Sequence, residues 1–548
     1  MLLLRHLLLP FLAGLAAAVD PLVDLQYTKL QGTALENGAT QWLGVRYAAS
    51  PTGALRFAAP VDPPGGLAGE VVDATQFRPI CLPRSASDFT MKPNKRFTVA
   101  EDCLYLNVFA PSNATASADN KRPVLYFVQG GGFQSNSNAN FNGSDLAVFG
   151  DIVVVQINYR VGPFGFAQSK EVQAGRSLNN GLKDMIQGLK WTKQYIAQFG
   201  GDPDQVVAGG DSAGATAVAM LLPAFADKDP GLFKGIILES ASVATLRTLE
   251  QGQEQYDCLT NATGCSTTAD SLACLRGLNA SALQTEQCQF NPHFDGDLVK
   301  TSMLDAYQRG QFLKVPTITG ACGDEGTKNV PQDTDTMAAA RTYINNQASG
   351  ALSNGSLDLI QKLYLDAPQP VFAGAGRLWR PLANAHGDFR STCITAALAD
   401  GLARAGVPTY SYRYAVRDPE QDALGFGAYH TVELNGVFGP DNTDGAPPKS
   451  YRTSNAPIVP VTMAYWASFV KTRDPNPARL AGSPEWKPWT VRGRERLRFE
   501  TGAGMGMESM NDTQRANCDM FAPMMGAMET PLDKPGSVAL TRNETVPA

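Results

Sequence analysis

The pentapeptide at residues 210–214 limits what this chain can fold into more than any other feature. It reads Gly-Asp-Ser-Ala-Gly and fits the pattern G-x-S-x-G. The apolar run before it, residues 205–209, predicts a buried strand, and the Ala-, Leu- and Met-rich residues 213–222 predict a helix. A serine on such a sharp strand-to-helix turn is a nucleophile elbow, which exposes the Ser212 hydroxyl at a helix N-terminus. The alternative is an ordinary turn in which Ser212 only caps the helix.

A second glycine-rich stretch lies upstream, where the apolar run 124–128 ends in Gln-Gly-Gly-Gly-Phe at residues 129–133. Consecutive glycines lose much conformational freedom when they are ordered and contribute no side-chain packing. They are useful where backbone N–H groups must point into a site without side chains in the way. An acyl-transfer site needs such donors for its oxyanion. A flexible turn is the alternative interpretation of this stretch.

Short apolar runs alternate with helical patterns, which predicts an α/β fold with a mostly parallel central sheet and helices on both faces. Residues 182–199 predict the helix that leads into the elbow strand. Residues 250–310 and 330–400 contain mostly helical patterns and loops, which we interpret as helical insertions on the sheet. The other predicted strands are residues 41–48, 101–111, 124–128, 152–157, 235–239, 315–320 and 410–414.

The length of 548 residues favours about three to four domains as a prior. No Pro/Ser-rich linker, charge block or internal repeat divides the chain, so we expect a single catalytic domain over residues 19–548. A hydrophobic content of 43% and a charged content of 18% are typical of a globular protein with a large core. The net charge of −6 gives no reason to expect a nucleic acid partner.

Residues 1–18 have the pattern of a secretory signal peptide, because Arg5 precedes an apolar stretch and three alanines at residues 16–18 suit cleavage. We therefore expect a secreted protein. We expect no stable membrane anchor, because the tail beyond residue 533 is polar and there is no other apolar run of 18 residues. Seven N-x-S/T sequons suit a glycoprotein surface: Asn113, Asn142, Asn261, Asn279, Asn354, Asn511 and Asn543.

The chain has nine cysteines, and an odd number in an oxidising compartment leaves at least one thiol free or bonded to another chain. No C-x-x-C pattern or His-rich cluster occurs. The four histidines are His6, His293, His386 and His430. This composition gives little support to a zinc site, so we expect neither a metal nor another cofactor.

Taken in order, residues 101–111, 129–133, 199–214, 323–326 and 430–439 resemble the type-B carboxylesterase/lipase family, relatives of the cholinesterases. The resemblance covers nearly the whole chain after the signal segment, and the chain is identified as a secreted, fungal-type member. The resemblance implies an α/β-hydrolase fold and hydrolysis of carboxylic esters through an acyl-enzyme intermediate, without a cofactor.

The resemblance also implies a catalytic triad in which Ser212 is the nucleophile, Glu325 the acid and His430 the base. The imidazole takes the serine proton, and the carboxylate fixes the imidazole tautomer and stabilises its charged form. The oxyanion hole implied by the family is formed by the N–H groups of Gly131, Gly132 and Ala213. Alternatives stay open for the acid, Asp324 or Asp422, and for the base, His386 or His293.

Three positions depart from the family pattern. Gln129 stands where His or Tyr is usual before the glycines, Asp211 replaces the usual Glu before the serine, and Ala208 replaces a larger aliphatic residue in the elbow strand. None of these changes removes a catalytic group. We expect Gln129 and Asp211 to tune the pocket.

The resemblance further implies the disulfides Cys81–Cys103 and Cys265–Cys274, and the buried ion pairs Arg56–Glu101 and Arg160–Asp184. Spacing assigns no partner to the remaining cysteines, Cys258, Cys288, Cys322, Cys393 and Cys518.

The expected function is that of a secreted serine carboxylesterase acting on small-molecule esters. The alternatives are a lipase or sterol esterase and, in another class, a binding module that keeps the fold without catalysis. The first disulfide loop, residues 82–102, is short, lacks Trp and is basic, with Arg84, Lys92, Lys95 and Arg96. This favours soluble, neutral or anionic esters over triglycerides and choline esters. Alternatively, a segment within residues 330–400 sets the specificity.

Overall fold

The computed structural model describes residues 20–65, 69–84, 98–114, 121–136, 141–175, 177–443 and 447–529. The expected signal segment, residues 1–18, lies outside this range. So do the sequon Asn543 and much of the first disulfide loop, including Lys92, Lys95 and Arg96.

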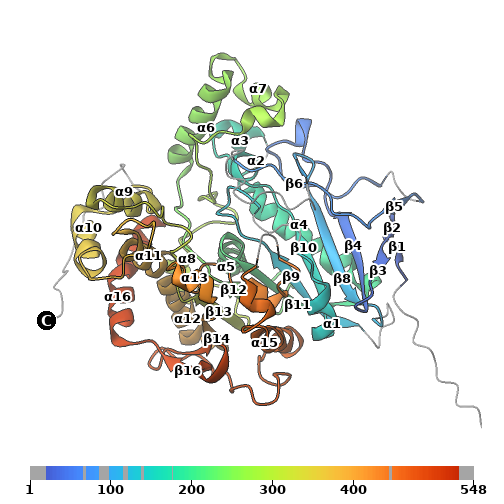
Figure 1. The fold of residues 1–548 in the computed structure, drawn as a ribbon. Helices are drawn as coiled ribbons and strands as arrows, with labels where there is room; N and C mark the ends of the chain where they lie inside the picture. The colour runs from blue at the N-terminus through green and yellow to red at the C-terminus, as the bar shows by residue number, and fades with distance from the viewer. Residues whose placement is uncertain are drawn as a thin grey trace, which may run out of the picture.

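Eleven strands among the described residues form one sheet, which crosses the molecule in Figure 1. In their order across the sheet they are β16 (Gly506–Ser509), β15 (Glu495–Phe499), β14 (Thr409–Tyr414), β13 (Thr317–Cys322), β12 (Gly235–Glu239), β11 (Gly201–Asp211), β9 (Arg122–Val128), β10 (Val153–Ile157), β8 (Tyr105–Pro111), β4 (Ala39–Arg46) and β3 (Thr33–Ala34). Two smaller sheets comprise β1 (Leu22–Asp24), β2 (Lys29–Gln31) and β5 (Val71–Asp73), and β6 (Ile80–Cys81) with β7 (Val99–Ala100).

The centre of the large sheet is parallel. Neighbouring strands from β10 to β15 run in parallel, whereas β8, β4 and β3 at one edge and β16 at the other pair antiparallel. This confirms the predicted α/β class. Strand β13 begins at Thr317, two residues later than predicted, because Pro316 has no N–H to donate to a ladder.

The α-helices of the described residues surround this sheet (Figure 1). They are α1 (Ser144–Gly150), α2 (Gly162–Phe166), α3 (Lys170–Gly175), α4 (Asn180–Tyr195), α5 (Ala213–Ala224), α6 (Leu249–Thr263), α7 (Ser271–Gly277), α8 (Met303–Arg309), α9 (Met337–Gln347), α10 (Asn354–Ile360), α11 (Trp379–Gly387), α12 (Cys393–Arg404), α13 (Pro419–Ala423), α14 (Leu434–Val437), α15 (Ile458–Thr472) and α16 (Asp512–Met528).

Alternate residues of the central strands pack into two separate cores, one on each face of the sheet. In β10, Val153 and Val155 belong to one core and Val154 to the other. The first core also contains apolar residues of α4, α5 and α12, and the second contains those of α1 and α15. Successive strand side chains point to opposite faces, so a strand that is apolar throughout needs helices on both sides. The two predicted helical layers are therefore present.

The two predicted insertions are largely helical. Residues 250–310 contain most of α6 together with α7 and α8, and residues 330–400 contain α9, α10, α11 and most of α12. In Figure 1, α6 and α7 project beyond the sheet at the top, while α9 and α10 lie at one side near α16.

Four disulfides connect eight of the nine cysteines. Cys81–Cys103 and Cys265–Cys274 are the two expected pairs. Cys258–Cys288 and Cys393–Cys518 are the two that spacing could not assign. Cys322, at the end of β13, is a free and buried thiol.

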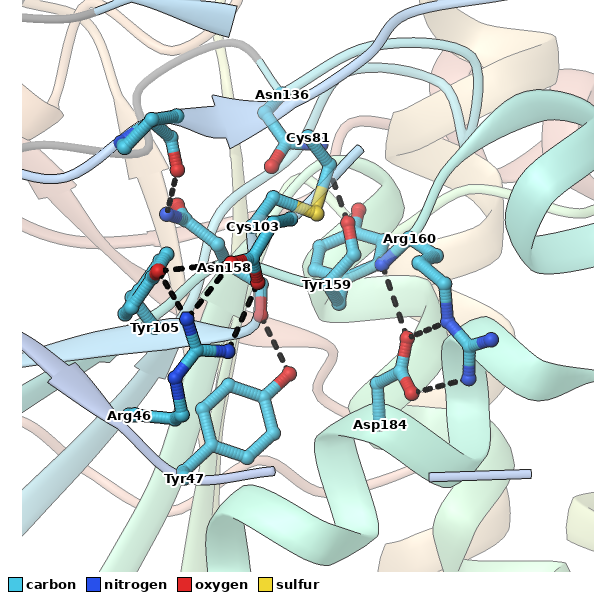
Figure 2. The surroundings of a disulfide bond; sticks show 12 residues. Arg46, Tyr47, Cys81, Cys103, Tyr105, Asn136, Asn158, Tyr159, Arg160 and Asp184 are labelled. Carbon is cyan, nitrogen blue, oxygen red and sulfur yellow. Dashed lines mark hydrogen bonds and ion pairs between the residues drawn. A yellow bond between two sulfur atoms is a disulfide. The ribbon is translucent and has the colours of Figure 1, made fainter. Parts of the chain in front are cut away.

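Both expected arginine–carboxylate pairs are present. Arg160 Nε and Nη2 donate to the two oxygens of Asp184 at 2.8 and 2.7 Å, and both side chains are buried. Figure 2 shows this pair close to the Cys81–Cys103 disulfide. Arg56 Nη2 donates to Glu101 Oε2 at 2.7 Å, and its Nη1 donates to the Leu275 carbonyl at 2.7 Å. Each guanidinium is thus compensated by a carboxylate, as burial requires.

Candidate active site

Ser212 occupies the turn between β11 and α5 with φ 53° and ψ −122°, a backbone conformation that few non-glycine residues adopt. The glycines on either side permit this turn. A Cβ atom on Gly210 would lie 2.5 Å from the Val128 carbonyl oxygen, and one on Gly214 would lie 2.0 Å from the same atom. The backbone of the elbow therefore approaches the end of β9 closely, as predicted, and this holds Ser212 beside that strand end.

Ser212, His430 and Glu325 form a continuous hydrogen-bonded chain. His430 Nε2 lies 2.9 Å from Ser212 Oγ, and His430 Nδ1 pairs with Glu325 Oε2. Glu325 follows β13 and His430 lies in the segment after β14. A parallel bridge between Asp324 and Tyr429, each one residue earlier, joins these two segments. This bridge sets the acid and the base side by side although they are far apart in the chain.

The alternative acids have other partners. Asp324 pairs with Arg380 and Arg417, and its Oδ2 accepts the Ala428 N–H at 2.9 Å. Asp422 pairs with Arg417 near the surface at 3.1 Å. Among the three carboxylates considered, the described contacts of His430 are therefore with Glu325.

The alternative bases are also engaged elsewhere. His386 lies in the same cavity, with Nδ1 at 3.3 Å from the Tyr343 hydroxyl. His293 is buried, and its Nδ1 lies 3.1 Å from the Asn291 carbonyl oxygen. Burial lowers the pKa of His386 to about 3 and that of His293 to about 4, so both are neutral.

The buried Glu325 carboxylate is held by further donors. Its Oε1 accepts hydrogen bonds from Ser240 Oγ and from the Cys322 N–H, both at 2.6 Å. Burial opposes its charge, but His430 and these donors lower its pKa below the usual value. Burial likewise opposes a charge on His430, yet the adjacent Glu325 carboxylate raises the pKa of His430 to about 9. The pair is therefore built to stabilise an imidazolium.

Sequence reasoning did not identify the polar layer beneath this pair. Glu433 Oε1 accepts from Ser240 Oγ at 3.2 Å, and Glu433 Oε2 accepts from Cys322 Sγ at 2.8 Å. Burial, together with the charge of Glu325, raises the pKa of Glu433 to about 7. Glu433 lies three residues after His430, and the polar residues Thr431 and Asn435 stand close to it in the sequence, so no local pattern distinguishes it.

The glycine loop presents backbone donors to the site. Gly131 and Gly132 have φ values of 116° and 63°, in the region that favours glycine. The N–H groups of Gly131, Gly132 and Ala213 have no protein acceptor within the described residues, and all three residues line the cavity at Ser212. Free N–H groups at this place suit a developing oxyanion.

The cavity above Ser212 has a volume of about 550 Å³ and is lined mainly by polar side chains. Its walls come from the glycine loop, residues 242–245, residues 289–291 and the insertion at 329–391. A larger hollow of about 880 Å³ lies between α8, α12 and α16, and none of Ser212, His430 and Glu325 lines it.

The three departures from the family pattern have different surroundings. Gln129 is buried and donates to Asn136 Oδ1 at 3.0 Å, and it is not among the described residues that line the cavity. Asp211 does line it, and its Oδ1 accepts the Gly130 N–H at 3.0 Å. Burial raises the pKa of Asp211 to about 6. Ala208 is buried within the sheet.

Within the described parts of the chain, no cluster of three or more His, Cys, Asp or Glu side chains could hold a metal ion. No helix there is both long enough and apolar enough to cross a bilayer.

Comparison with known proteins agrees with this geometry. The sequence model of the family described as "Carboxylesterase family" matches residues 19–520. Para-nitrobenzyl esterase of Bacillus subtilis is 31% identical over 483 residues, which cover 83% of this chain and 90% of that protein. Neuroligin-3 of Mus musculus is 28% identical over 532 residues. The match covers 84% of this chain but only 62% of that longer protein.

Among solved structures, the crystal structure of Aspergillus niger EstA superposes with a TM-score of 0.86 at 37% identity, covering 93% of this chain and 99% of that one. The fold is accordingly that of an α/β-hydrolase. A family match across nearly the whole chain, on a fold that brings Ser212, His430 and Glu325 together, shows that the chain belongs to the carboxylesterase family.

Proposed function

We propose that this protein is a secreted serine carboxylesterase that hydrolyses small-molecule carboxylic esters through a Ser212–His430–Glu325 triad. The observation that supports this best is the hydrogen-bonded chain from Ser212 Oγ through His430 to Glu325, open to a cavity of about 550 Å³. The catalytic unit is proposed to be a single domain over residues 19–548, since the large sheet takes strands from Thr33 to Ser509.

In the proposed reaction, Ser212 Oγ attacks the ester carbonyl carbon while His430 Nε2 accepts its proton. The oxyanion that forms receives hydrogen bonds from the N–H groups of Gly131, Gly132 and Ala213. His430 then donates its proton to the leaving alkoxide, and an acyl-enzyme remains on Ser212. Water, deprotonated by His430, hydrolyses this ester and restores the free serine. Glu325 stays ionised throughout and orients the imidazole.

Secretion and glycosylation are part of the proposal. The four disulfides are typical of an oxidising compartment. Five sequon asparagines are exposed and Asn142 is partly exposed, which leaves room for glycans. The exposed ones are Asn113, Asn261, Asn279, Asn354 and Asn511. Sequencing the N-terminus of the secreted protein tests cleavage after Ala18, and a mass decrease on glycosidase treatment tests the sequons.

The decisive experiment combines covalent labelling with hydrolysis. A fluorophosphonate probe should label the wild-type protein at Ser212 and leave Ser212→Ala unlabelled. Nitrophenyl esters of graded chain length should be hydrolysed by the wild type, and Ser212→Ala should lose turnover while its circular dichroism spectrum is unchanged. Near-normal hydrolysis by Ser212→Ala, or no labelling of the folded wild type, would refute the proposal.

A further inference from the structure

Arg390 lies in the wall of the cavity above Ser212, on the π-helical turn Asp388–Thr392 between α11 and α12. Among the described lining residues it is the only arginine or lysine. Burial lowers its pKa to about 10, which leaves it charged at neutral pH. A positively charged residue therefore forms part of the wall of the cavity at Ser212.

This charge has no carboxylate partner among the described residues. Arg390 Nη1 donates to the Gln347 carbonyl at 3.1 Å, and its other contact is with Met528 Sδ at 3.9 Å. Asp388, two residues earlier, instead accepts from the Tyr364 hydroxyl at 2.7 Å. Nε and Nη2 of Arg390 thus make no protein hydrogen bond in the described part of the chain, and neither atom is sealed from solvent.

Three arginines that are also enclosed, Arg56, Arg160 and Arg380, differ from Arg390 in having a carboxylate partner. Arg56 and Arg160 each make two-pronged bonds to a carboxylate, and Arg380 pairs with Asp324. A guanidinium kept away from bulk water is costly unless a charge compensates it. For Arg390 no described carboxylate provides this compensation, and the residue lines the cavity.

The other residues that line the cavity suit a polar, anionic substrate. Amide and hydroxyl groups dominate near Arg390, including Asn329, Tyr343 and Asn346. His386 is neutral, because burial and the positive charges of Arg390 and His430 lower its pKa to about 3. The one carboxyl group among the described lining residues, Asp211, lies next to Ser212 and binds the Gly130 N–H.

We propose that Arg390 binds a free carboxylate on the substrate, so that the preferred esters carry a carboxylate in addition to the ester group. Half-esters of dicarboxylic acids and hydroxy acids acylated on their hydroxyl group belong to this class. The guanidinium fork offers Nε and Nη2 in the planar geometry that a carboxylate accepts as two parallel hydrogen bonds. This inference rests on the proposed esterase function and specifies its substrate.

Two matched ester pairs test the inference. 4-Nitrophenyl hemiglutarate is compared with 4-nitrophenyl pentanoate for a carboxylate in the acyl part, and 4-acetoxybenzoate with phenyl acetate for one in the alcohol part. In at least one pair, the wild type should favour the anionic ester by about tenfold or more in kcat/KM. In that pair Arg390→Gln should lower the ratio by about ten- to a hundredfold, and Arg390→Lys should retain part of it.

The exposed Arg452, which pairs with Asp441, provides the matched control, and Arg452→Gln should keep the wild-type ratio. A wild type with no anionic preference in either pair would overturn the inference, as would Arg390→Gln with an unchanged ratio.

If Arg390→Gln fails to fold, inhibition of the wild type by glutarate tests the inference instead. Glutarate should inhibit competitively, whereas uncharged glutaramide should not. Failure of the esterase proposal is distinct, because then neither ester of a pair is hydrolysed and Ser212 is not labelled.

Discussion

Ser240 Oγ donates a hydrogen bond of 2.6 Å to Glu325 Oε1, from the residue that directly follows β12. The Cys322 N–H binds the same oxygen, which leaves Oε2 for His430. The carboxylate that orients the imidazole is therefore itself oriented by two donors from neighbouring strand ends. In the proposed mechanism Ser240 is a positioning residue, because it would act on the reacting atoms through Glu325 and His430.

Replacing Ser240 by alanine should lower kcat by about tenfold, because one donor to a buried carboxylate is lost. The pH at which activity is half-maximal should also shift, which a purely structural role would not produce. Ser468→Ala is a suitable control, since the Ser468 hydroxyl is bonded to the Asp474 carbonyl in a different region. Wild-type kcat and an unchanged pH profile in Ser240→Ala would contradict the assigned role.

The pH profile should report His430. As the proposed base, His430 would work only as neutral imidazole, so kcat/KM should fall as the pH drops through its pKa. Burial alone would move that pKa down, but the Glu325 carboxylate raises the pKa of His430 to about 9. The acid limb should therefore lie above the ordinary histidine value of about 6.5. Glu325→Gln removes the negative charge, so it should move the limb to lower pH and reduce kcat. A limb that Glu325→Gln leaves in place would speak against the pairing.

Breaking the Arg160–Asp184 pair should destabilise the fold severely. Asp184→Asn leaves a buried guanidinium without its counter-charge, so the free energy of unfolding should fall by about 3–5 kcal/mol. The exposed pair Lys449–Glu420 provides the comparison, because Glu420→Gln should change stability by less than about 1 kcal/mol. Urea denaturation of the two variants measures both effects. Equal, small losses would show that the buried pair needs no charge.

Cys322 should be inert in the native protein. It is buried, and burial together with Glu433 raises the pKa of its thiol well above the usual value, so little thiolate forms at neutral pH. A chromogenic disulfide reagent should find no reactive thiol in the folded chain and one after denaturation without reductant. Rapid reaction in the native state, or more than one thiol after unfolding, would contradict the assigned disulfide pattern.

The sequence predicted those parts of the site that have a local signature. The elbow at Ser212 and the glycines at 131 and 132 are visible because tight turns and close backbone approach leave few residue types possible. The choice of Glu325 over Asp324 and Asp422 as the acid could not be made from a local pattern. It depends on Arg380 and Arg417, which reach Asp324 from other segments, and on the bridge between Asp324 and Tyr429.

Ser240, Glu433 and Arg390 were not identified because nothing in their own neighbourhoods marks them. Ser240 acts only because β12 ends beside β13, and Arg390 matters only because its turn forms a cavity wall. Strand order and insertion packing create these contacts, and they follow from long-range topology rather than from a local pattern. The expectation about the basic first disulfide loop falls largely outside the described residues and stays a prediction.

The Cys393–Cys518 disulfide spans 125 positions and closes a covalent ring that includes His430. Arg390 lies three residues before the ring begins. Met528, which contacts Arg390, lies ten residues after the ring ends. A protease that cuts one peptide bond within the ring would therefore release nothing, because the disulfide would still join the two fragments. Such a nicked molecule would migrate as one band on a non-reducing gel and as two after reduction, so an intact band without reductant is no proof of an intact chain.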